Sequence, residues 1–137
     1  MMQSNRGAAQ YRAVRSHGLV EGTSPTRLVQ IMFEHILINL ATAQGCMARI
    51  EDNLPLSEVT KKLAAMRKAI QLIGQLNDTL DMERGGKIAE DLRALYEYML
   101  VRLTQANAYN DTRIVAEVTN LVREIKSGWD RIVSDAR

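Results

Sequence analysis

The chain has 137 residues and a formal net charge of +2, with 46% hydrophobic and 25% charged residues. These values indicate one globular domain and do not favour a nucleic-acid groove. Cys46 is the only cysteine, which excludes an intrachain disulfide, and the polar N-terminal stretch lacks the apolar segment of a secretory signal. The longest mostly apolar run, residues 28–43, is too short and too polar to span a bilayer, so we expect a cytosolic protein without membrane insertion.

Residues 1–23 contain three glycines and show little periodicity. We interpret them as a flexible N-terminal arm with isolated apolar side chains, among them Tyr11 and Val14. Ser24 and Pro25 then favour a helix start, because serine caps free N–H groups and proline suits the first helical position. Residues 24–137 are therefore predicted to form the folded domain.

The first predicted helix runs from Pro25 to about Arg49, and the second restarts at Ser57 after the loop around Pro55. Each helix carries one apolar stripe at helical spacing and a second row beside it. In the first helix the second row comprises Val29, Phe33 and Leu37. In the second helix, whose main stripe ends at Leu80, it comprises Ala65, Ala69, Leu72 and Leu76.

Gly85 and Gly86 allow a tight reversal into a third helix, whose apolar stripe starts at Ile88 and which ends near Asn107. Asn110 and Asp111 provide a turn and a cap for a fourth helix, in which Trp129 is expected to be a core anchor. Four helices joined by short loops predict an all-α fold, an antiparallel up-down-up-down four-helix bundle.

Residues with recognisable chemistry are sparse. Neither His17 nor His35 belongs to an HExxH or ExxH motif, and no GxSxG motif is present, so we expect no metal, no cofactor and no enzymatic activity. One alternative is a histidine phosphotransfer bundle that uses His35, and another is a purely structural, self-associating bundle. The first would need His35 to be exposed near a basic side chain.

Surplus apolar surface is the main signal. A bundle helix needs one stripe for its core, so the second rows of the first two helices have two interpretations. They either widen the core or form a groove that receives another chain's helix, with the N-terminal arm covering the empty groove.

The stretch LDMERGGKIAEDLRALYEYML, residues 80–100, resembles the central pattern of the FliS family of flagellar secretion chaperones. Further similarities extend over nearly the whole chain: Tyr11, Ser24-Pro25, Met32-Phe33, Asn110-Asp111, Glu117-Val118 and Trp129. The resemblance implies a chaperone that binds the C-terminal segment of flagellin in the cytoplasm, prevents its premature polymerisation and assists its delivery to the export gate of the flagellar type III apparatus. It implies no cofactor, and it is compatible with a homodimer in the free state.

The apolar rows and the resemblance together suggest which residues bind the partner. We expect the arm to compete with the flagellin segment for the groove formed by the apolar rows of the first two helices. The predicted partner-binding residues are Tyr11, Val14, Val29, Phe33, Leu72, Leu76, Leu80 and Ile88.

Overall fold

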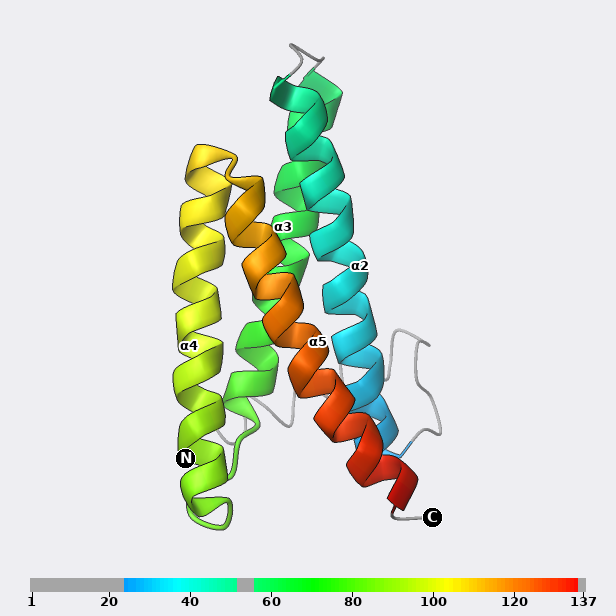
Figure 1. Cartoon of the computed structure of the whole chain (residues 1–137), viewed down its shortest axis with the longest axis vertical. Coiled ribbons are helices and arrows are strands. Elements are labelled where there is room, and N and C mark those ends of the chain that lie inside the picture. The colour runs from blue at the N-terminus through cyan, green and yellow to red at the C-terminus, as the bar shows by residue number, and fades with distance from the viewer. Residues whose placement is uncertain (1–23, 52–55, 136–137) are drawn as a thin grey trace.

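The computed structural model describes residues 24–51 and 56–135 (Figure 1). Its four helices are α2 (Pro25–Glu51), α3 (Leu56–Asp78), α4 (Gly86–Tyr109) and α5 (Thr112–Asp135). The predicted all-α fold is confirmed, and the predicted helix limits agree with the observed ones to within a few residues. The predicted N-terminal arm, with Tyr11 and Val14, lies outside the described residues.

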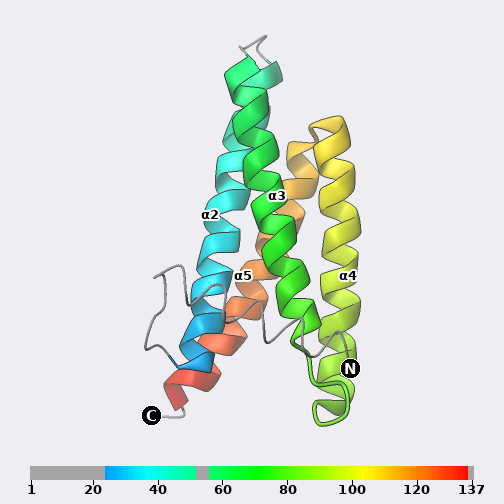
Figure 2. The same ribbon diagram turned by 180° about the vertical axis from the view of Figure 1, so that it is seen from behind.

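The helices form an antiparallel bundle in which each one packs beside its neighbours in the chain, and α5 returns to pack beside α2. Among these four helices, the diagonal pairs α2–α4 and α3–α5 make no close backbone contact. Figures 1 and 2 show the resulting up-down-up-down course from opposite sides. They also show that α2 and α3 extend beyond the corner that joins α4 to α5.

Local hydrogen bonds explain where the helices begin and end. The Ser24 side chain accepts a hydrogen bond from the backbone N–H of Arg27 at 3.2 Å, as expected for an N-cap. Asn110 ends α4 in the left-handed conformation, with a φ of 52°, and its N–H donates to the carbonyl of Ala106. The carboxylate of Asp111 then accepts from the N–H of Arg113 at 3.0 Å, which caps α5.

The glycine pair has two separate structural reasons. Gly86 has a φ of +52°, a left-handed conformation that side chains rarely adopt. Gly85 has an ordinary φ, but a Cβ there would lie 2.6 Å from the Cβ of Ala89 and 2.8 Å from the carbonyl oxygen of Asp81. One glycine therefore supplies conformational freedom, and the other allows close packing of the corner.

The core is wider than a single stripe per helix. Phe33, Leu72 and Leu76, which were predicted to face a partner, are buried members of the main hydrophobic cluster. The second row of α3 is therefore needed by the core itself, because α3 packs against α2 on one side and α4 on the other. Trp129 is not fully buried, as a core anchor would be, but packs half-buried against the edge of this cluster.

Candidate partner-binding site

The two ends of the bundle differ in how completely they bury their apolar stripes. Near the corner between α4 and α5, each helix contributes side chains with 0% exposure: Met47, Met66, Leu103 and Val115. Toward the end where α3 turns into α4, residues in the same stripes become progressively exposed. The difference lies in the packing and not in the sequence pattern, since the apolar spacing continues.

Seven residues correspond to almost two helical turns, so residues at this spacing share a face. On α2, a step of seven residues leads from the fully buried Ile36 to the half-buried Val29. Leu80, two residues after the end of α3 at Asp78, is half-buried as well. The N-terminal half of α4 shows a larger change. Ile88 lies three turns before Met99 on the same face, yet Ile88 is 73% exposed and Met99 is 0% exposed.

Side-chain exposure also changes along α5, where it increases toward the C-terminus of the helix. Val118 is fully buried, Ile125 is half-buried and Ile132 is 62% exposed, although the three are spaced by seven residues. Apolar side chains of α2, α4 and α5, together with Leu80 after the end of α3, are thus partly or largely exposed at one end of the bundle. We call this surface the open end; it comprises Val29, Leu80, Ile88, Leu92, Leu95, Ile125, Trp129 and Ile132.

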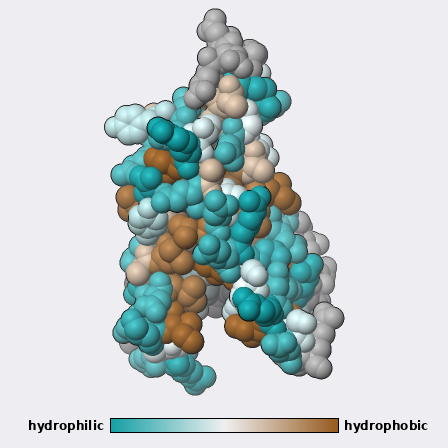
Figure 3. Space-filling model, in the orientation of Figure 1, coloured by the Kyte–Doolittle hydropathy of each residue, from teal (hydrophilic) through white to brown (hydrophobic). Residues whose placement is uncertain are grey.

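The open end corresponds to a notch between α4 and α5. Figure 1 shows these helices close together near their shared corner and diverging toward the other end. In Figure 3, hydrophobic surface lines the region between the two diverging helices. Apolar side chains from α2, α4 and α5 and from the turn after α3 meet at this opening and provide an apolar site that a partner's helix or extended segment can enter.

Polar contacts explain why α4 and α5 separate there. Near their corner, Glu117 on α5 accepts a hydrogen bond from Arg102 Nε at 2.9 Å and another from Tyr98 Oη at 2.8 Å, both on α4. The hydrogen bond from Arg102 is the main reason why the pKa of Glu117 is lowered.

At the other end, α5 is held to α2 instead. Trp129 Nε1 donates to the carbonyl of Thr26 at 3.0 Å, and Gln30 Nε2 donates to Asp130 Oδ1 at 2.8 Å. Lys126 binds the other carboxylate oxygen of Asp130 at 2.6 Å and is the main cause of the lowered pKa of Asp130. The C-terminal part of α5 therefore follows α2 and leaves the N-terminal part of α4 uncovered.

The predicted site residues fall into three groups. Val29, Leu80 and Ile88 belong to the open end, while Phe33, Leu72 and Leu76 are buried in the core. Tyr11 and Val14 lie outside the described residues. The sequence interpretation missed the contribution of α5, especially Ile125 and Ile132, whose heptad spacing from Val118 was the available signal.

Other kinds of site find little support in the part of the chain that the structure describes. No group of three or more His, Cys, Asp or Glu side chains there could hold a metal ion. His35 lies partly buried on α2. None of the four helices combines the length and the apolar character needed to cross a membrane.

Comparison with known proteins identifies relatives over almost the full length. The family described as "Flagellar protein FliS" matches residues 7–136. The chain is 40% identical over 131 residues to the flagellar secretion chaperone FliSB of Pseudomonas aeruginosa, an alignment that covers 96% of this chain and 98% of the relative. It is 36% identical to the flagellar secretion chaperone FliS of Vibrio cholerae (93% and 89% covered) and 34% identical to that of Salmonella typhimurium (96% and 93% covered). These relatives are named as chaperones and not as enzymes.

Proposed function

Because the chain belongs to the FliS family of flagellar secretion chaperones, we propose that it binds the C-terminal segment of flagellin and that the open end is the centre of this binding surface. Binding in the cytosol prevents premature polymerisation of flagellin and accompanies its delivery to the flagellar export gate. The family membership makes the chain a chaperone and not an enzyme, and leaves the phosphotransfer alternative at His35 without support.

The uncovered apolar stripe of α4 is the observation that carries this proposal. Ile88 and Leu92 have the spacing of core residues, but α5 is held to α2 and does not cover them. An apolar client segment that enters the notch would complete the core, and each fully buried aliphatic side chain would contribute roughly 1.5–3 kcal/mol. Ordering of the client opposes this gain, which favours a wide contact over a single pocket.

The N-terminal segment with Tyr11 and Val14 is proposed to compete for the same surface. Its isolated apolar side chains match the chemistry of the open end, and it has no helical periodicity of its own. Phe33, Leu72 and Leu76 then pack beneath the open end as core residues. The exposed residues of the open end contact the client directly.

Calorimetric titration with a flagellin C-terminal fragment tests the proposal. We expect Ile88→Asp and Ile132→Asp to weaken binding tenfold or more, since each places a charge on apolar surface that the client would bury. The matched control is Val101→Asp, because Val101 is 58% exposed on the same helix as Ile88 but lies outside the open end. Wild-type affinity in both open-end variants, with helical circular dichroism intact, would place the client elsewhere.

A further inference from the structure

A separate exposed apolar surface lies on α3, along the side that faces α4 and away from the notch between α4 and α5. Leu56, Leu63 and Ile70 are spaced by seven residues, with Val59 between the first two. Leu56 is 77% exposed and Leu63 is 43% exposed, while Val59 and Ile70 are half-buried. We call these four residues the α3 ridge.

The ridge is exposed because the first turns of α3 extend beyond the end of α4. Lys62 Nζ donates to the carbonyl of Asn107 at 3.0 Å and to Asn110 Oδ1 at 2.8 Å, so Lys62 lies level with the end of α4. Leu56 is six residues before Lys62, which places it about 9 Å beyond that level at 1.5 Å per residue. The projecting ends of α2 and α3 in Figures 1 and 2 therefore have no continuation of α4 beside them.

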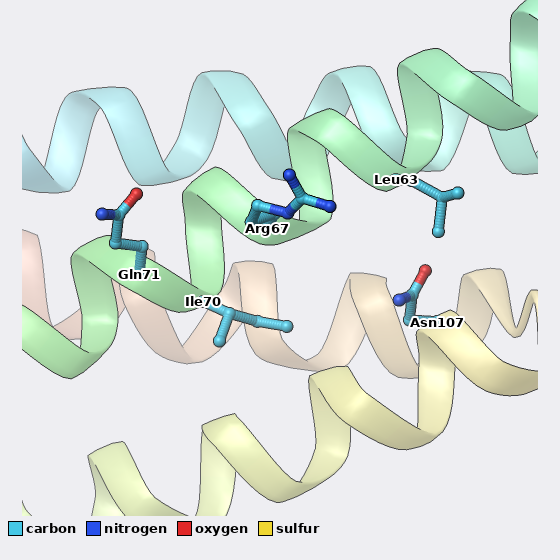
Figure 4. A pocket seen from close by; sticks show the side chains of 5 residues that line it. All are labelled: Leu63, Arg67, Ile70, Gln71 and Asn107. Atoms are coloured by element: carbon cyan, nitrogen blue, oxygen red, sulfur yellow. The ribbon is translucent and has the colours of Figure 1, made fainter.

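An open depression of about 440 Å³ continues the ridge toward the middle of the bundle. Leu63, Arg67, Ile70 and Gln71 line it from α3, and Asn107 lines it from α4 (Figure 4). Leu63 and Asn107 point toward one another across it. Asn107, which lines the depression, has a side-chain oxygen that is buried without a hydrogen-bond partner in the described part of the chain.

The charge of α3 indicates what kind of segment would fit. No acidic residue occurs between Glu58 and Asp78, whereas this stretch contains four basic residues. Lys61, Arg67 and Lys68 are exposed, and none of them forms an ion pair with another described residue. In heptad terms, Leu56, Leu63 and Ile70 occupy equivalent core positions and Arg67 flanks them, which is where an interhelical partner places an acidic side chain.

We propose that the α3 ridge is a second docking surface that receives an amphipathic helix with acidic flanks from another protein. This helix lies beside α3 where α4 has ended and extends into the depression near Asn107. The surface is on the opposite side of α4 from the notch, so the chaperone is able to hold a client and an acidic helical partner simultaneously. The proposal does not depend on the identity of the client.

Fluorescence anisotropy with a labelled synthetic helix tests the surface on the full chain. The probe has about three heptads, with leucine at the core positions and glutamate at the flanking positions, and a second probe replaces each glutamate with lysine. We expect saturable binding of the glutamate probe that Leu56→Asp weakens at least tenfold. Ile38→Asp is the matched control, since Ile38 is 60% exposed on α2.

Charge reversal provides the specific readout. Arg67→Glu should weaken binding of the glutamate probe severalfold and strengthen binding of the lysine probe. Arg123→Glu on the exposed face of α5 should change the affinity for neither probe. The proposal would be overturned by absence of saturable binding, by equal affinity of all variants, or by loss of binding in Ile88→Asp but not in Leu56→Asp. Concentration-dependent self-association that Leu56→Asp abolishes would also overturn it, because a second copy of the chain would then be the occupant.

Discussion

Substitution of either glycine at the corner between α3 and α4 should destabilise the fold, each for a different reason. Gly86→Ala should destabilise the fold by about 1 kcal/mol or more, because its φ of +52° is unfavourable for a side chain. Gly85→Ala should cost about 1–3 kcal/mol for a different reason, since the added Cβ would overlap Ala89 and the Asp81 carbonyl.

The matched control for both is Gly128→Ala, because a Cβ at Gly128 in α5 meets nothing within 4 Å. This change should be neutral or slightly stabilising, as expected for glycine inside a helix. Chemical denaturation of the three variants measures all these effects. Equal stability of Gly86→Ala and Gly128→Ala would contradict the assigned backbone strain.

Lys62 predicts an unusual dependence on alkaline pH. Burial lowers its pKa below the ordinary value of 10.5, so in this range the unfolded chain binds more protons than the folded one. At neutral pH the buried ammonium lowers the free energy of unfolding. This loss of stability decreases as the pH rises from the folded pKa toward 10.5, because Lys62 then gives up its proton in the folded state. The free energy of unfolding of the wild type should therefore rise relative to that of Lys62→Met over this range. A constant difference between the two proteins would show that Lys62 has the same pKa in both states.

At the scale of the helices, Glu117 on α5 links α5 to α4 beside the notch through its hydrogen bonds with Arg102 and Tyr98. Its pKa is lowered, chiefly by Arg102, so its stabilising contribution is complete above the ordinary value of 4.5 and is lost as the pH falls through the folded value. Because the pair is partly exposed, we expect Glu117→Gln to lower the free energy of unfolding only slightly at neutral pH.

This difference should shrink as the pH falls below 4.5, which denaturation at a series of pH values would measure. Glu124→Gln, an exposed change on the same helix, provides the control for the substitution itself. A pH-independent difference for Glu117→Gln would mean that packing and not charge links the helices here.

The helices themselves were predictable from the sequence, and the open end was only partly so. Periodicity shows which way a side chain faces along its helix, but it does not show whether another helix lies opposite. Ile88 and Met99 therefore have equivalent positions in the pattern of α4 and opposite exposures. Leu72 and Leu76 show the reverse error, since a second apolar row suggested a free surface and the packing of α3 against both neighbours buries it.

At the scale of the whole molecule, the N-terminal segment is predicted to regulate access to the open end. Deletion of residues 1–20 should leave the helical circular dichroism unchanged and should tighten binding of the flagellin fragment, because a competing segment has been removed. Calorimetry of the shortened protein, with Ile88→Asp as a second change, would assign the effect to the open end. Loss of binding on deletion would show instead that this segment contacts the client.

Trp129 is the only tryptophan of the chain, and its indole lies half-buried at the open end with its N–H bound to the carbonyl of Thr26. The intrinsic emission of the protein therefore originates at the surface that the client is proposed to cover. A fragment without tryptophan should shift this emission toward the blue as water leaves the indole, and the α3-ridge probe should leave it unchanged. The molecule thus contains its own optical reporter, which distinguishes occupancy of one surface from occupancy of the other without any label.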